Sequence, residues 1–115
     1  MCLLYHHFSH IKNFKLTYFI REKSFVAFLA AKILRANQVA IVFGKTIYLH
    51  NTSQAVFFNN KPWLRHELKH IQQYQRLGFI NFLVAYLVES FKNGYYNNKF
   101  EVEARAAEDD VSVDV

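Results

Sequence analysis

The chain has 115 residues and a formal net charge of +5, and 52% of its residues are hydrophobic. A chain of this length builds one domain around a single core, and so apolar a composition excludes an intrinsically disordered protein. The only cysteine is Cys2, which excludes an internal disulfide framework and a cysteine-based zinc site, so that a metal site would need histidines and carboxylates.

The positive charge is concentrated in the body of the chain. Residues 1–100 carry 13 Lys and Arg against three Glu, whereas residues 101–115 carry Arg105 against six acidic residues. A basic body favours weak association with nucleic acid or an anionic membrane, although a solvated surface partly neutralised by the acidic end is the simpler interpretation. We predict one domain over residues 1–110 and an acidic tail over residues 111–115.

No segment has the clear pattern of a secretory signal or of a membrane-spanning helix. The longest apolar stretch, residues 79–88, is interrupted by Asn81 and is shorter than the roughly 20 residues that cross a bilayer. We therefore expect a cytoplasmic protein in which this stretch forms a buried core helix.

The first half of the chain predicts a helix followed by a β-hairpin. Residues 1–20 have no firm hydrophobic period, and we assign no element there. Between residues 22 and 37, one face carries apolar side chains at helical spacing: Phe25, Phe28, Leu29, Ile33 and Ala36. Two β-branched runs, Val39–Phe43 and Thr46–His50, flank a Gly-Lys pair as in a hairpin, and residues 55–58 suggest a third short strand.

The second half of the chain predicts three helices. Pro62 lies in the first turn of a helix over residues 61–76, which ends before a glycine. An almost wholly apolar helix over residues 79–92 follows, and the short connection makes it an antiparallel neighbour of the first. A loop over residues 93–98 leads to a final helix over residues 100–109. Together these elements predict an α+β fold of three to four helices, with a small antiparallel hairpin or sheet before the first of the three.

The helix over residues 61–76 carries the motif His66-Glu67-Leu68-Lys69-His70. Its two histidines are four residues apart, so that one helical face, opposite a polar stripe, presents both imidazoles to a single ion. Glu67 can take a proton from a metal-bound water without binding the metal itself. The pattern predicts a mononuclear zinc site that needs a third protein ligand; two core histidines paired with Glu67 or with backbone groups are the alternative interpretation.

This motif resembles that of the gluzincin clan of zinc metallopeptidases, in which a helical glutamate ligand follows downstream. The likeness is greatest to compact bacterial zincin-like proteins of uncharacterised function, over roughly residues 38–108. In those proteins the motif extends to His-Glu-x-x-His-x-x-Gln, and a loop rich in Tyr and Asn precedes Glu-x-Glu-Ala. The matching residues here are Gln73, residues 95–98, and the run Glu101-Val102-Glu103-Ala104.

The resemblance implies a minimal zincin-like domain in which zinc is held by His66, His70 and Glu101, with Glu67 as the general base. The chain departs from related membrane-embedded zincins at one position. Those proteins have Asp after the Glu-x-x-Ala run, whereas this chain has Arg105. The group that supports the metal ligands is therefore not identified by the motif.

Two other glutamates, Glu89 and Glu103, are alternative candidates for the third metal ligand. Glu89 stands about where a thermolysin-like ligand would, and in an antiparallel helix pair it returns roughly level with His66 and His70. On the final helix, Glu103 points roughly 200° away from Glu101, at about 100° per residue. We therefore place Glu101 first and keep the other two as alternatives.

Three further residues are candidates for a supporting role. Tyr95 or Tyr96 could donate a hydrogen bond to the oxyanion of a reacting peptide, with packing of the aromatic rings as the alternative. Gln73, close beyond His70 on the same helix, could steady the third ligand or a neighbouring loop.

The predicted function is that of a zinc-dependent metallopeptidase that hydrolyses a peptide or protein substrate with a zinc-bound water activated by Glu67. The hairpin before the motif helix would offer its edge to an extended substrate. Three alternatives remain: a zinc-binding domain without turnover, a nucleic-acid-associated zincin-like module, and a membrane-surface module that uses residues 79–91.

Overall fold

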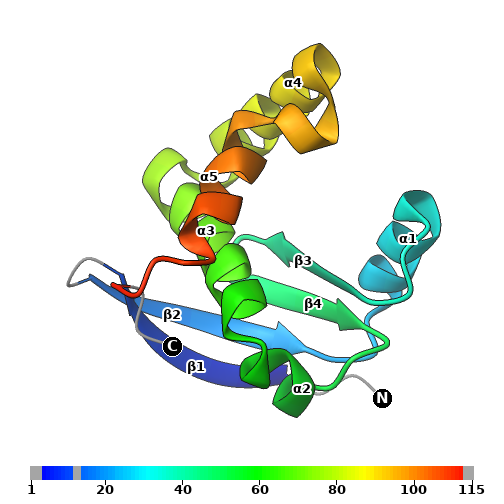
Figure 1. Cartoon of the computed structure of the whole chain (residues 1–115), viewed down its shortest axis with the longest axis vertical. Helices are drawn as coiled ribbons and strands as arrows, with labels where there is room; N and C mark the ends of the chain where they lie inside the picture. Colours follow the sequence, from blue (N-terminus) through cyan, green and yellow to red (C-terminus); the bar gives the residue numbers. More distant parts are fainter. Residues whose placement is uncertain (1–3, 12–13, 113–115) are drawn as a thin grey trace.

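The computed structural model describes residues 4–11 and 14–112, with side chains from residue 16 onward. Within these residues it contains five helices and a four-stranded sheet in the order β1-β2-β4-β3 (Figure 1). The strands are β1 (Leu4–Ile11), β2 (Phe14–Arg21), β3 (Val39–Phe43) and β4 (Thr46–His50), and the helices are α1 (Phe25–Leu34), α2 (Gln54–Asn59), α3 (Lys61–Leu77), α4 (Phe79–Asn97) and α5 (Lys99–Ala107). The predicted α+β class is confirmed, whereas Cys2 and residues 113–115 of the predicted tail lie outside the described residues.

The first two strands occupy the stretch to which we assigned no element. β1 pairs antiparallel with β2, and β2 pairs in parallel with β4, so that the sheet is mixed rather than antiparallel throughout. Along β2, Leu16, Tyr18 and Ile20 are buried, and Thr17 and Phe19 between them are half-buried. Lys15, Thr17 and Arg21 alternate with these buried residues in the sequence, a period of two that Phe19 alone interrupts.

The predicted hairpin of β3 and β4 is present, and β3 forms one edge of the sheet. Its turn uses Gly44 with a φ of 62°, a conformation that glycine adopts without strain. Alternate residues of the hairpin face opposite layers. Val42 belongs to the main core beneath α3, whereas Val39 packs with α1 on the other face.

Residues 55–58, suggested as a strand, are instead part of helix α2. The Ser53 hydroxyl caps this helix by accepting a hydrogen bond from the Val56 N–H at 3.1 Å. Phe57 is completely buried in the main core. The cap and the burial of one large ring outweigh the weak local strand pattern.

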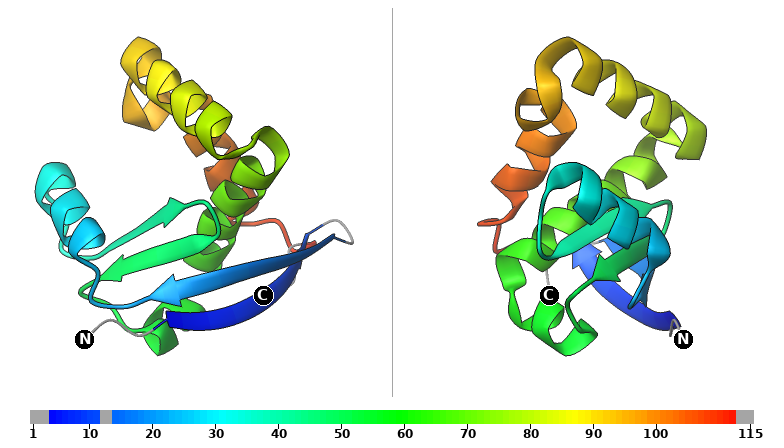
Figure 2. Two further views of the ribbon diagram at one scale, coloured as in Figure 1. Left: turned by 180° about the vertical axis from the view of Figure 1, so that it is seen from behind. Right: turned by 90° about the vertical axis from the view of Figure 1, so that its right-hand side faces the viewer.

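Helix α3 begins after Asn60, whose side-chain oxygen accepts from the Trp63 N–H at 3.2 Å, and it ends at Gly78. The prediction that the next helix runs antiparallel beside it is wrong. After Gly78, with a φ of 90°, α4 leaves at an angle, and the right-hand view of Figure 2 shows α3, α4 and α5 as three sides of a triangle. It is therefore α5, not α4, that crosses the middle of α3.

The C-terminal part of α4 also differs from the predicted loop. Gly94 has a φ of 79° and kinks the chain, after which residues 95–97 form a further helical turn. This kink directs the chain back towards α3. Among the described residues, no helix combines the length and apolar character that crossing a membrane requires.

Candidate metal centre

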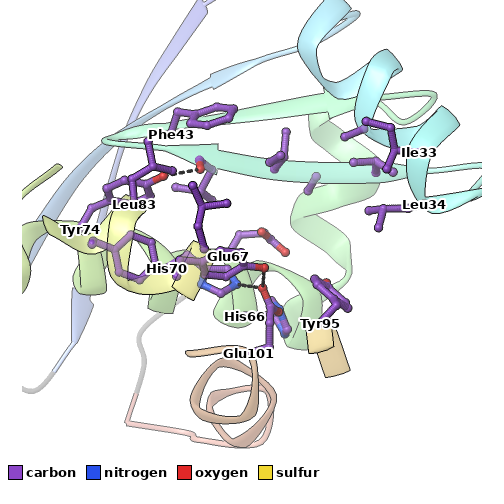
Figure 3. A pocket seen from close by; sticks show the side chains of 18 residues that line it. Ile33, Leu34, Phe43, His66, Glu67, His70, Tyr74, Leu83, Tyr95 and Glu101 are labelled. Atoms are coloured by element: carbon purple, nitrogen blue, oxygen red, sulfur yellow. Dashed lines mark hydrogen bonds and ion pairs between the residues drawn. The ribbon is translucent and has the colours of Figure 1, made fainter. Parts of the chain in front are cut away.

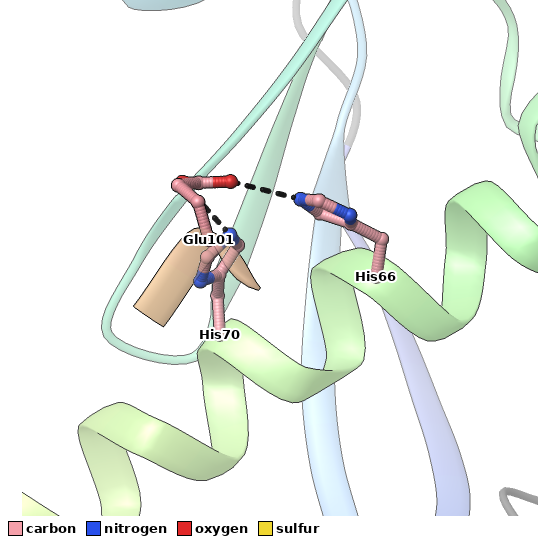
Figure 4. A group of neighbouring side chains, drawn as sticks. All are labelled: His66, His70 and Glu101. Carbon is pink, nitrogen blue, oxygen red and sulfur yellow. Dashed lines mark hydrogen bonds and ion pairs between the residues drawn. The ribbon is translucent and has the colours of Figure 1, made fainter. Parts of the chain in front are cut away.

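The two histidines of the motif and one glutamate of α5 converge. His66 and His70 lie one turn apart on α3 and face Glu101 (Figure 4). The Glu101 Oε1 atom is 3.1 Å from His66 Nε2, and its Oε2 atom is 3.2 Å from His70 Nε2. One ligand atom from each residue lies within 4.8 Å of the other two. The structure thus brings together the three residues that we placed first as metal ligands.

Asn98 and Ala104 bring α5 close enough for this contact. The Asn98 side chain caps α5 by accepting from the Phe100 N–H at 2.9 Å, and its Nδ2 donates to the Tyr86 carbonyl at 3.0 Å. Ala104 is completely buried, and its small side chain permits close approach of α5 and α3. The cap places Glu101 in the first turn of α5, facing the histidines.

The outer nitrogen of each imidazole has a hydrogen-bond acceptor. His66 Nδ1 lies 2.8 Å from Glu108 Oε2, and His70 Nδ1 lies 2.9 Å from Gln73 Oε1. In the neutral imidazoles these acceptors hold the proton on Nδ1, which leaves each Nε2 atom, facing a Glu101 oxygen, to bind a cation. The donor set and its supporting hydrogen bonds therefore fit a divalent metal ion.

Gln73, one of the predicted supporting residues, joins α3 to α5. Its Nε2 atom donates to the Phe100 carbonyl at 3.1 Å and to Glu103 Oε1 at 2.9 Å, while its oxygen accepts from His70. The Glu103 carboxylate also lies 3.5 Å from Arg76 Nη2 and is directed away from the imidazoles. Glu103 therefore supports Gln73 and does not join the cluster.

The structure does not bring Glu89 to the histidines. Its carboxylate accepts from Asn93 Nδ2 at 2.9 Å and from the Lys99 N–H at 3.2 Å, at the far end of α4. The expectation that it returns level with the motif depended on an antiparallel pair, and α4 does not run along α3.

Two contributors to the site were missed in the sequence. Glu108 stands seven residues after Glu101, which places both on one helical face. This spacing could have indicated that Glu108 lies near the histidines. Tyr86 donates its hydroxyl to Glu101 Oε2 at 2.6 Å, and nothing distinguishes this tyrosine from its apolar neighbours in the sequence.

Arg105 packs against Tyr96. Its guanidinium lies 3.9 Å from the centre of the Tyr96 ring and donates to the Tyr96 carbonyl. Of the two predicted oxyanion donors, only Tyr95 lines the cavity beside the site.

A cavity of about 350 Å³ opens beside the three converging residues (Figure 3). Glu67, His66, His70 and Glu101 contribute its polar atoms, and edge strand β3 forms one wall. The remaining lining is mostly apolar and comes from three elements: Ala30, Ile33 and Leu34 of α1, Tyr74 of α3, and Phe82, Leu83, Tyr86, Leu87 and Tyr95 of α4.

The three converging residues form a coupled charge cluster. Burial disfavours the charged imidazole of His66, but the hydrogen bond to Glu101, the charge of Glu67 and the hydrogen bond to Glu108 outweigh it and raise its pKa to about 9. A similar balance raises the pKa of His70. Burial alone would raise the pKa of Glu101, whereas both imidazoles and Tyr86 hold it well below its usual range. A carboxylate that stays ionised in a buried site is a strong ligand for a cation.

Glu67 behaves differently, although it neighbours a ligand. It is only 5% exposed, and this burial raises its pKa to about 7 against the lowering effect of His70 and His66. No hydrogen bond within the described part of the chain fixes its carboxylate. A carboxylate with a pKa near neutrality can accept and release a proton at physiological pH.

Comparison of the chain with protein-family models, with curated proteins and with solved structures finds no match. The chemistry of the site is therefore argued from its own residues. Three of them could together hold a cation, and the Glu67 carboxylate lies beside them in the same mostly apolar cavity.

Proposed function

We propose that the protein is a zinc-dependent metallopeptidase. The observation that carries this proposal is the coincidence, in one cavity, of three side chains that can ligate a metal ion and a buried carboxylate with a pKa near 7. A structural metal site has no need of the cavity or of the additional carboxylate.

Two imidazoles and one carboxylate suit zinc better than calcium or magnesium, which prefer oxygen ligands. His66, His70 and Glu101 would hold the ion, and a bound zinc supplies a Lewis acid for a carbonyl and for water. Glu108 and Gln73 orient the imidazoles, and Tyr86 fixes one Glu101 oxygen.

Glu67 is the proposed general base. It lies on α3 between the two histidines and lines the same cavity, so that its carboxylate is beside the ligands without belonging to their cluster. It takes a proton from the attacking water and passes it to the leaving amine. The apolar lining of the cavity keeps bulk water from the carboxylate and maintains its raised pKa.

Strand β3 supports a peptide as the substrate. The Val42 carbonyl accepts from the Tyr74 hydroxyl at 3.2 Å, which shows that this carbonyl points away from β4. Because hydrogen-bonding directions alternate along an antiparallel strand, the N–H and C=O groups of Ala40 point to the same free edge. An extended peptide can pair with this edge and lie beside the metal-ligating residues.

The proposal is tested with the purified wild-type protein. Elemental analysis is expected to find about one zinc per chain. The protein should cleave an unfolded protein substrate, lose this activity to a chelator, and regain it when zinc is added. Zinc retention without hydrolysis of any unfolded substrate would indicate a catalytically silent zinc-binding domain, and absence of zinc would remove the basis of the proposal.

Glu108 offers a more specific prediction. Replacing Glu108 with alanine removes the acceptor of the His66 Nδ1 proton, and zinc affinity is expected to fall about 10- to 100-fold. A competitive titration against a chromophoric chelator measures this change. Asp109→Ala is the matched control, because Asp109 is exposed and adjacent. Equal affinities of the two variants would show that Glu108 does not support the metal site.

A further inference from the structure

Apolar side chains are exposed on two helices that flank the cavity. Along α1 only Ala27 and Ala31 are buried, and most of its larger apolar residues face solvent. Along α4 only Phe82 is buried, so the expectation that residues 79–88 form a buried core helix is wrong. Most of the large exposed apolar residues in the described part of the chain lie on α1 and α4, and such a concentration is typical of an interaction surface.

The exposed residues extend to the ends of the two helices. Figure 1 and the reverse view in Figure 2 show α1 and the C-terminal end of α4 as two arms on the same side of the molecule. Ile33, near the end of α1, is 81% exposed, and Phe91, on α4, is 92% exposed. Ile33 and Leu34 of one arm and Leu87 and Tyr95 of the other line the same cavity, so the arms border its mouth.

Positive charge accompanies these apolar arms. Lys32 and Arg35 lie at the end of α1, Lys92 lies beside Phe91, and all three are exposed. The only acidic residue on either helix is Glu89, whose Oε1 atom accepts from Asn93 Nδ2 and from the Lys99 N–H, so that three exposed cations outnumber one carboxylate. Apolar residues with an excess of adjacent cations are complementary to an anionic lipid surface.

A second copy of the chain or a bound peptide would account for fewer of the exposed apolar and charged residues on this surface. A symmetric contact with a second copy would bring Lys32, Arg35 and Lys92 against the same positive arms of the partner, which is unfavourable. A peptide in the cavity would cover Ile33 and Leu87, but it would not cover Phe91, which does not line the cavity.

We propose that the ends of α1 and α4 dock on an anionic phospholipid bilayer, so that the mouth of the cavity opens towards the membrane surface. The apolar residues enter the interface while Lys32, Arg35 and Lys92 contact lipid phosphates. This docking does not depend on the proposed peptidase activity.

Co-sedimentation of the full chain with phosphatidylcholine vesicles, with and without phosphatidylserine, tests this proposal. Binding is expected only with phosphatidylserine, and it should weaken as salt is raised. Lys32→Glu/Lys92→Glu should reduce the partition coefficient at least about thirtyfold, since each cation near the surface contributes about fivefold. Ile33→Ser/Phe91→Ser should reduce it at least about tenfold, and because both residues are exposed the fold should be retained.

Matched variants carry the same changes elsewhere on the surface. Lys45→Glu/Lys61→Glu and Val56→Ser/Val102→Ser alter exposed residues outside the arms and should retain binding. The proposal is overturned if the protein does not bind anionic vesicles at low salt, or if arm and control variants lose binding equally. It is also overturned if sedimentation shows a dimer that Ile33→Ser/Phe91→Ser dissociates while lipid binding is unchanged, because the arms would then be an interface between copies.

Discussion

Replacing Glu101 with alanine is expected to weaken zinc binding at least about a hundredfold. Three protein ligands share a binding free energy on the order of 10 kcal/mol, so that one ligand contributes about 3 kcal/mol. Glu101 is 3% exposed and its two oxygens contact both imidazoles, which leaves no other carboxylate in the cluster to replace it. Competitive chelator titration at constant pH measures the loss, and circular dichroism checks that the variant is folded.

Glu89→Ala and Glu103→Ala are the controls for this prediction. The Glu89 carboxylate accepts hydrogen bonds from the Asn93 side chain and the Lys99 N–H. The Glu103 carboxylate contacts Gln73 and Arg76, so neither change removes a proposed metal ligand. His66→Ala and His70→Ala should lose zinc as fully as Glu101→Ala. If Glu89→Ala proved the most damaging of the three glutamate changes, the ligand set would be wrong.

The elements determined by local signals were predictable from the sequence. Helix α3 has an asparagine cap, a proline in its first turn and a clear apolar face, and the hairpin has a Gly-Lys turn between two β-branched runs. These signals act within a few residues of one another. They located the motif helix and the inward direction of His66 and His70 correctly.

The direction of α4 was not predictable from local signals. A glycine between two helices indicates a change of direction but not its angle, and here the angle prevents Glu89 from reaching the motif. The likeness to zincins, by contrast, pointed to Glu101, which does converge on both imidazoles. Long-range packing therefore decided between two glutamates that the sequence pattern alone left open.

The β1–β2 pair and the supporting residues also depend on tertiary structure. β2 joins the sheet in parallel with β4, and the pattern of a single strand does not specify such a pairing with a distant segment. Tyr86 supports Glu101 only because α4 and α5 meet at the kink after Gly94. Such a residue is recognised from its hydrogen bond and not from its spacing.

Glu67→Gln is expected to retain about one zinc per chain and to lose hydrolysis at least about a hundredfold. The side chain does not belong to the ligand cluster, and the amide has nearly the same shape as the carboxylate but cannot accept a proton from water. The fold should also be retained, because burying a neutral amide costs less free energy than burying an ionised carboxylate in this 5% exposed position.

Zinc content and kcat/KM for an unfolded protein substrate are measured on the same preparation of Glu67→Gln, so that loss of metal and loss of the base are separated. Glu103→Gln makes the same chemical change on α5, where the new amide oxygen can still accept from Gln73, and it should keep both zinc and activity. Full activity of Glu67→Gln would exclude Glu67 as the base. Loss of zinc from the folded variant would instead make Glu67 a metal ligand and would remove it from the role of general base.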